Sequence, residues 1–167
     1  MTIKKTTMAE LPAVMQIYDE ARAFMRESGN QEQWPEGWPS VEQITEDIEK
    51  GASYLCLNDS NEIATVFYFK VEEDPGYAII DGKWLNNEPY GVIHRIARSQ
   101  SVSNTKGSGA FCVEWCFSQH QNLRIDTHRD NAPMLVMLKR LGFKYCGVIQ
   151  LWPGKDGERI AFQKTRP

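Results

Sequence analysis

The segment Asn104-Thr-Lys-Gly-Ser-Gly-Ala110 places two glycines between a predicted strand at 92–97 and a predicted helix at 111–120. The first backbone N–H groups of a helix have no intrahelical partner, and the helix dipole favours an anion beside them. Gly107 and Gly109 also lack the Cβ atoms that would keep a ligand away from the backbone. The segment therefore predicts a turn that binds an anion such as a phosphate.

The composition is that of an ordinary globular protein, with 167 residues of which 41% are hydrophobic and 25% charged. We expect one domain over residues 1–167. The net charge of -3 argues against general nucleic-acid binding. The N-terminus lacks the apolar core of a secretory signal, and no run reaches the roughly 20 apolar residues of a membrane helix. We therefore expect a cytoplasmic protein with no membrane or nucleic-acid partner.

Cys112, Cys116 and Cys146 are predicted to pack in the core. The four cysteines of the chain show no zinc-ligand pairing, and we expect a reducing compartment. They are Cys56, Cys112, Cys116 and Cys146. No metal site is expected.

Hydrophobic periodicity and turn residues predict the other elements. Capping boxes at Thr7–Glu10 and Ser40–Gln43 precede two helices, one carrying Leu11 to Met25 and one ending before Gly51. A further helix over 131–141 ends at Gly142. Strands are expected at 3–6, 53–57, 63–71, 77–80, 123–126, 144–151 and 159–163.

The order of these elements predicts the fold class. The early strands are joined by short turns, which implies antiparallel pairing, and the later strand–helix–strand unit implies a parallel pair. The result is an α/β three-layer sandwich around a mixed, mostly antiparallel sheet.

Three segments resemble the GCN5-related N-acetyltransferases, and the likeness covers nearly the whole chain. The strand at 94–97 with the glycine turn resembles the family's acyl-CoA pyrophosphate motif, Gln/Arg-x-x-Gly-x-Gly/Ala. The run from Leu123 through Asn131 to Gly142-Phe143 is similar to the family's strand, asparagine, helix and Gly-Phe ending. Gln33-Trp34 and Trp38-Pro39 resemble a bacterial subgroup that acts on small molecules.

The resemblance implies an acyl-CoA N-acyltransferase fold, whose sheet is splayed at its centre, and acetyl-CoA as cofactor. Pantetheine would enter between the strands ending near Arg98 and Asp126, and the pyrophosphate would meet backbone amides of the turn. The implied cofactor-binding residues are Ile96, Ala97, Arg98, Asn104, Thr105, Lys106, Gly107, Ser108, Gly109, Ala110 and Asn131.

Three positions depart from the family pattern. Asn104 replaces the usual Gln or Arg, and Ser108 replaces an aliphatic residue. Leu138 stands where many members carry a tyrosine that protonates the leaving thiolate. Water or another group then protonates the thiolate, or its low pKa makes an acid unnecessary, or activity is weak or lost.

Acetyl transfer to an amine needs a base to take up the amine's proton. Asp126, at the end of the strand lining the predicted wedge, is the first candidate, although a capping or substrate-binding carboxylate is the plain alternative. His94 is the second, because imidazole suits proton transfer near neutral pH. His128, Glu72 and Glu73 are weaker candidates.

Trp34, Trp38 and Trp84 are predicted either to build the acceptor pocket or to close the core under a loop. The acidic Glu32, Glu36 and Glu42 favour a cationic small molecule as acceptor.

The main functional hypothesis is thus an acetyl-CoA-dependent N-acetyltransferase acting on a small-molecule or peptide amine, and the family likeness also allows a homodimer. The alternative is a non-catalytic acyl-CoA-binding or sensor module. A nucleotide-binding protein is disfavoured, because neither Gly-x-Gly-x-x-Gly after the first strand nor a Gly-Lys-Ser/Thr ending occurs.

Overall fold

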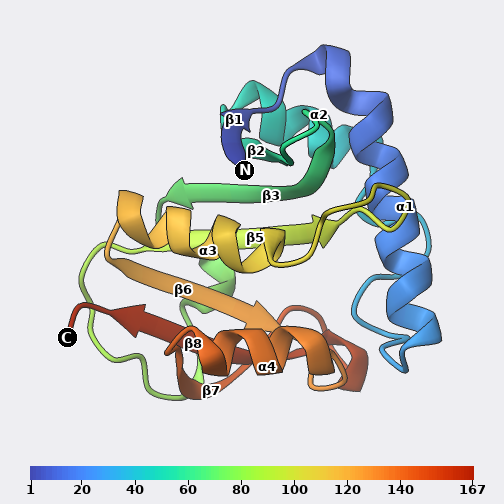
Figure 1. The fold of residues 1–167 in the computed structure, drawn as a ribbon. Helices are drawn as coiled ribbons and strands as arrows, with labels where there is room; N and C mark the ends of the chain where they lie inside the picture. Colours follow the sequence, from blue (N-terminus) through green and yellow to red (C-terminus); the bar gives the residue numbers. More distant parts are fainter.

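The computed structural model describes residues 1–167. Eight strands form one mixed sheet in the order β1-β2-β3-β5-β6-β8-β7-β4 (Figure 1). The strands are β1 (Thr2–Lys5), β2 (Ser53–Leu57), β3 (Ile63–Val71), β4 (Asp81–Gly82), β5 (Gly91–Arg98), β6 (Asn122–Thr127), β7 (Lys144–Gln150) and β8 (Glu158–Thr165). The predicted α/β sandwich with a mixed sheet is confirmed.

The only parallel pair is β5 with β6, and it is short. Only Gly91 with Leu123 and Val92 with Arg124 are paired, so the two strands separate toward their C-terminal ends. All other neighbours pair antiparallel. The sheet is therefore splayed at its centre, as the family likeness implies.

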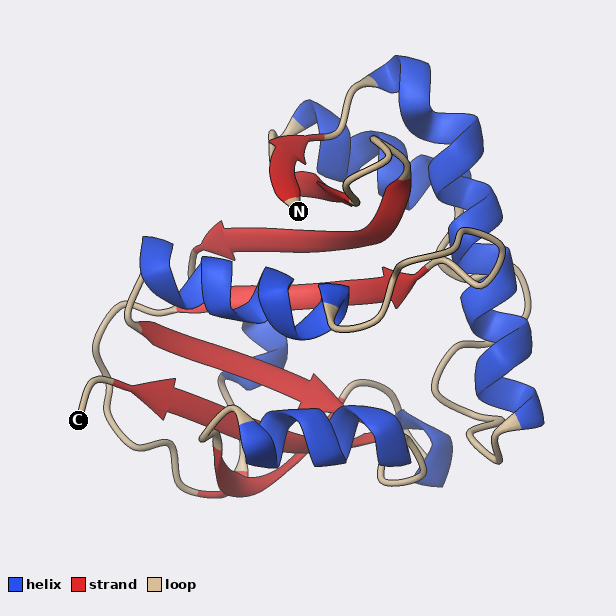
Figure 2. Ribbon diagram, in the orientation of Figure 1, coloured by secondary structure: helices blue, strands red, loops and turns tan.

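Helices cover both faces of the sheet (Figure 2). They are α1 (Leu11–Glu27), α2 (Val41–Glu49), α3 (Ser108–Gln119) and α4 (Ala132–Arg140). On β3, Val66 packs in a core with α1 and α2, while its neighbour Phe67 packs in a second core with α3. Because successive side chains of a strand point to opposite faces, the two helix pairs lie on opposite sides of the sheet. None of the four helices is long and apolar enough to cross a membrane.

Local capping signals set the helix ends. The Ser40 hydroxyl accepts from the Gln43 N–H at 3.1 Å at the start of α2. The Asn131 side chain accepts from the Met134 N–H at 3.3 Å at the start of α4. Gly142 follows α4 with φ 84°, a conformation that glycine adopts without a Cβ clash.

Two predicted elements differ in the structure. The expected strand at 77–80 is wrong: Asp74 caps a 3₁₀ turn over Pro75–Tyr77, and the strand is instead β4 at Asp81–Gly82. The helix expected from residue 111 begins at Ser108, because Gly107 (φ 81°) serves as its N-cap. The second glycine of the turn is therefore part of the first helical turn of α3.

Strand β5 contains a bulge close to the point where it separates from β6. The register with β3 shifts between Val66 and Tyr68, and Arg95 on β5 has φ 49°. A left-handed residue other than glycine costs roughly 1–2 kcal/mol. Contacts from both N-terminal helices hold this conformation: the Tyr18 hydroxyl donates to the Arg95 carbonyl at 2.8 Å, and Asp47 accepts from the Arg95 guanidinium at 2.8 and 2.9 Å.

Candidate active site

Two cavities meet where β5 and β6 separate. The larger cavity, of about 540 Å³, is lined by residues from α2, β3, β5, β6 and the loops around them. The smaller cavity, of about 360 Å³, lies between α1, β5 and the starts of α3 and α4. Four residues line both cavities, which are therefore continuous: Met25, Ile96, Asn131 and Met134.

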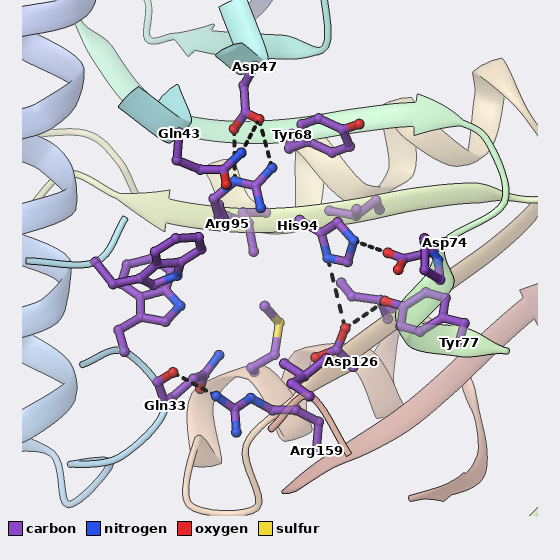
Figure 3. Close-up of a pocket in the computed structure, with 18 of the residues that line it drawn as sticks. Gln33, Gln43, Asp47, Tyr68, Asp74, Tyr77, His94, Arg95, Asp126 and Arg159 are labelled. Carbon is purple, nitrogen blue, oxygen red and sulfur yellow. Dashed lines mark hydrogen bonds and ion pairs between the residues drawn. The ribbon is translucent and has the colours of Figure 1, made fainter. Parts of the chain in front are cut away.

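His94 and Asp126, the two residues predicted as bases, both line the larger cavity (Figure 3). Nε2 of His94 lies 2.5 Å from a carboxylate oxygen of Asp74. Nδ1 of the same ring lies 3.9 Å from Oδ1 of Asp126. Burial works to raise the pKa of Asp74, but the hydrogen bond and charge of His94 outweigh it and lower the pKa. Asp74 is therefore the ionised partner that accepts from Nε2–H.

Tyr77 is hydrogen-bonded to Asp126 and fixes its position. Its hydroxyl donates to Oδ1 of Asp126 at 2.6 Å, and its side chain is almost fully buried. Burial, together with the charge of Asp126, raises the pKa of Tyr77 well above its usual value. Tyr77 therefore stays protonated and holds the carboxylate of Asp126 in one orientation.

Of the three tryptophans predicted to build the acceptor pocket, two line the larger cavity and one does not. Trp34 and Trp38 both line the larger cavity. Trp84 does not: it packs against Tyr77 and donates to the Tyr77 carbonyl at 3.0 Å, and the Arg124 guanidinium lies 4.2 Å from its ring centre. Trp84, which lies between β4 and β5, thus packs in a core with Tyr77 and Tyr90, and the structure does not bring it to the cavity.

Seven of the eleven predicted cofactor residues line the smaller cavity: Ile96, Ala97, Arg98, Gly107, Gly109, Ala110 and Asn131. Asn104, Thr105, Lys106 and Ser108 do not line it. The Ser108 hydroxyl is fully buried and forms hydrogen bonds with Thr65 at 2.6 Å and with the Thr105 carbonyl at 2.7 Å. The Ser108 side chain thus points into the protein and is hydrogen-bonded to Thr65 on β3, at a position where the family likeness led us to expect an aliphatic residue.

A chain of side-chain amides connects the two cavities. Asn131 uses its oxygen to cap α4, so its Nδ2 donates to Oε1 of Gln33 at 2.9 Å. Oε1 of Gln33 also accepts from Nδ2 of Asn30 at 2.8 Å. Oδ1 of Asn30 is then left buried without a partner, on a residue that lines the smaller cavity.

The sequence analysis did not predict this chain of amides. It also did not predict that Asp74 would hold His94 or that Tyr77 would hold Asp126. Asp74 and Tyr77 flank a Pro-Gly pair that we interpreted only as a break between strands. The Asp-Pro-Gly order is itself typical of a capped turn and could have indicated Asp74. Arg159, which lines the larger cavity on β8, carries no comparable local pattern.

A solved acetyltransferase of the GNAT family from Streptococcus agalactiae is 31% identical to this chain, covers 99% of it and is itself covered to 95%, with a TM-score of 0.86. The chain belongs to the GNAT family of acetyltransferases. No protein-family model matches the sequence, and no curated protein sequence does either.

Two solved structures of lower identity share the fold. A ribosomal-protein-alanine N-acetyltransferase from Brucella melitensis is 15% identical, with coverage of 99% of this chain and 100% of that one and a TM-score of 0.68. The NatC complex bound to a Gag peptide and CoA is 13% identical, with coverage of 99% and 98% and a TM-score of 0.65.

Leu138 stands where the family likeness led us to expect a tyrosine. Its side chain is fully buried in the core beneath α3, together with Phe143. It lines neither cavity.

Proposed function

We propose that the protein transfers the acetyl group of acetyl-CoA to a small-molecule amine by direct attack, within one GNAT-type domain spanning residues 1–167. The observation that carries this proposal is the continuity of the two cavities at Ile96 and Asn131. Residues suited to the cofactor line one side of the junction, and His94 with Asp126 lines the other. The Trp34 and Trp38 pair in the larger cavity supports the small-molecule subgroup.

The smaller cavity fits a polyanion attached to an amide-containing arm. Gly109 and Ala110 lie in the first turn of α3, whose N–H groups have no intrahelical acceptor. Arg98 and Arg140 line the same cavity, and neither has a carboxylate within 4.0 Å. Oδ1 of Asn30 would accept from an amide N–H of pantetheine, which would satisfy this buried oxygen.

Acetyl-CoA supplies an activated thioester, so the protein itself has to position the amine and remove its proton. We propose that the amine nitrogen binds beside the His94–Asp126 pair, on the cavity side, within hydrogen-bond reach of both. Because Asp74 accepts from Nε2–H, the lone pair of the neutral imidazole is on Nδ1, which faces Asp126. Asp126 attracts and orients the amine, and Nδ1 of His94 takes the proton.

The leaving thiolate receives no proton from Leu138, which is apolar and lines neither cavity. A thiol has an ordinary pKa of about 8.5, so its anion departs without a dedicated acid. The departure from the family tyrosine is therefore compatible with catalysis.

The proposal is tested by measuring thiol release from acetyl-CoA over a panel of amines, with mass spectrometry of the products. We expect turnover by the wild type and a loss of about 10²-fold or more in His94→Gln. His120→Gln, at a half-buried histidine outside both cavities, is the matched control and should retain full activity. Binding of acetyl-CoA without acetylation of any amine would instead support the non-catalytic module.

A further inference from the structure

Arg159 is a buried cation without a carboxylate partner. Its side chain is only 3% exposed and lines the larger cavity. Nη1 donates to the carbonyls of Asp156 and Glu158 at 2.6 and 2.9 Å, and Nη2 donates to the Gln33 carbonyl at 2.7 Å. These acceptors are neutral, and no carboxylate lies within 4.0 Å of the guanidinium.

Arg95, the other arginine lining the larger cavity, is different. Asp47 neutralises it through a bidentate ion pair at 2.8 and 2.9 Å. Burial lowers the pKa of Arg159, and Asp126 is the acidic group that most offsets this effect. A buried charge is costly unless it is paired. Arg159 is therefore the one arginine in this cavity with charge left to offer a ligand.

Gln33 adds a second donor at the same place. Oε1 of Gln33 already accepts from Asn30 and Asn131, at 2.8 and 2.9 Å, and the Thr127 hydroxyl lies 3.4 Å from it. The free end of the side chain is therefore Nε2, which can only donate. Because Gln33 lines the larger cavity and its carbonyl binds Arg159, the donors belong to one corner of that cavity (Figure 3).

This corner lies within reach of the acetyl-transfer residues. Asp126 on β6 pairs with Ala161 on β8, and Arg159 is two residues before Ala161. Arg159 and Ala161 thus face the same side, and Arg159 is diagonal to Asp126. Such diagonal neighbours lie about 7–8 Å apart. A molecule with a few atoms between its two charged groups can span that separation.

No acidic residue lining the cavity forms an ion pair with Arg159, although the charge of Asp126 acts on it from beyond 4.0 Å. Asp47 pairs with Arg95, Asp74 pairs with His94, and Glu72 pairs with Lys70 at 3.5 Å. The three glutamates that led us to expect a cationic acceptor, Glu32, Glu36 and Glu42, are exposed and line neither cavity.

We propose that Arg159 and Nε2 of Gln33 form a carboxylate subsite, and that the acceptor is a small amino acid whose amine reaches the His94–Asp126 pair. This inference rests on the proposed acetyltransferase function and names its substrate class. A guanidinium beside an amide N–H offers charge-assisted hydrogen bonds of the kind that hold a carboxylate.

The test compares each amino acid with its decarboxylated amine: lysine with cadaverine, ornithine with putrescine, phenylalanine with phenethylamine. Thiol release gives kcat/KM for the wild type, Gln33→Glu, Arg159→Gln and the control Arg129→Gln. Gln33→Glu keeps an oxygen for Asn30 and Asn131 but replaces the donor with an acceptor, so it preserves the local fold. Arg129 is exposed and lines neither cavity.

We expect the wild type to prefer at least one amino acid over its amine by about 10- to 100-fold, the range for hydrogen bonds to a charged group. In Gln33→Glu and Arg159→Gln the preference should fall at least about tenfold, through a higher KM for the amino acid than for its amine. Arg129→Gln should match the wild type.

A wild type that prefers the decarboxylated amines would overturn the carboxylate subsite while leaving the acetyltransferase function standing. Calorimetric titration with the N-acetylated amino acids gives a readout that needs no turnover. Binding to the wild type that is lost in Gln33→Glu supports the subsite even if no amine is acetylated. Absence of binding at millimolar concentration would reject it.

Discussion

Nδ1 of His94 lies 3.9 Å from Oδ1 of Asp126, while Asp74 holds Nε2 of the same ring at 2.5 Å. The ring is thus fixed by a carboxylate on one side and presents its basic nitrogen toward a second carboxylate across a gap. An amine nitrogen that bridges the two atoms from the cavity side, at hydrogen-bond distance from each, would contact both an acceptor of its proton and a fixed negative charge.

Asp74→Asn should separate orientation from proton transfer. The amide removes the charge that selects the Nε2–H tautomer, so we expect kcat to fall by about 10- to 100-fold. Affinity for acetyl-CoA, measured by calorimetry, should be unchanged because Asp74 does not line the smaller cavity. Asp59→Asn, at an exposed aspartate next to the N-terminus, is the control. Normal kcat in Asp74→Asn would remove the orienting role.

Asn30→Ala should weaken cofactor binding through the pantetheine arm alone. Losing the acceptor of a buried hydrogen bond costs about 1–3 kcal/mol, so we expect the Kd for CoA to rise by about tenfold or more. The Kd for 3′,5′-ADP, which lacks pantetheine, should stay the same. An equal rise in the Kd for both ligands would show that Asn30 does not act through the pantetheine arm.

Gly109→Ala should have opposite effects on stability and binding. A Cβ at Gly109 would lie 3.6 Å from Sδ of Met137, which is an ordinary contact. Replacing a helical glycine by alanine stabilises by about 0.4–1 kcal/mol, so the Tm should hold or rise. The added methyl group would stand in the smaller cavity and reduce CoA affinity. Ser118→Ala, near the far end of α3, should leave CoA affinity as it is.

Leu138→Tyr should not create a catalytic acid. The side chain is fully buried in an apolar core, and overpacking costs about 1–3 kcal/mol. We expect a lower Tm and no gain in kcat. Leu138→Ala should cost about 2–5 kcal/mol in the free energy of unfolding, measured in urea, through the cavity it leaves. A clear rise of kcat in Leu138→Tyr would contradict this assignment.

His128 should make the fold sensitive to mild acid. Burial first, and the charge of Arg159 second, lower the pKa of His128. The unfolded state therefore binds the proton more readily, and stability should fall as the pH drops below about 6.5. Nδ1 of His128 accepts from the Asp130 N–H at 3.1 Å, a bond that the oxygen of a glutamine can replace. In His128→Gln, urea unfolding should show a weaker dependence on pH between about 5 and 6.5.

The elements that are indicated by residues close together in the sequence were predicted well. The strands at Ser53–Leu57 and Ile63–Val71 have the expected bounds. The caps at Ser40 and Asn131 lie where side-chain oxygens precede helical patterns. Trp84 was harder to place, because a tryptophan suits a core and a pocket equally and only packing distinguishes them.

The sequence by itself determined most of the elements, their order and the glycine turn, because strand alternation, helix caps and turn glycines act over a few residues. Only the tertiary structure decided which side chains meet. Asp74 is 20 residues from His94, Tyr77 is 49 from Asp126 and Gln33 is 98 from Asn131, yet each pair is hydrogen-bonded. These contacts depend on the splay of β5 from β6 and on loops packed across it, and no local pattern encodes either.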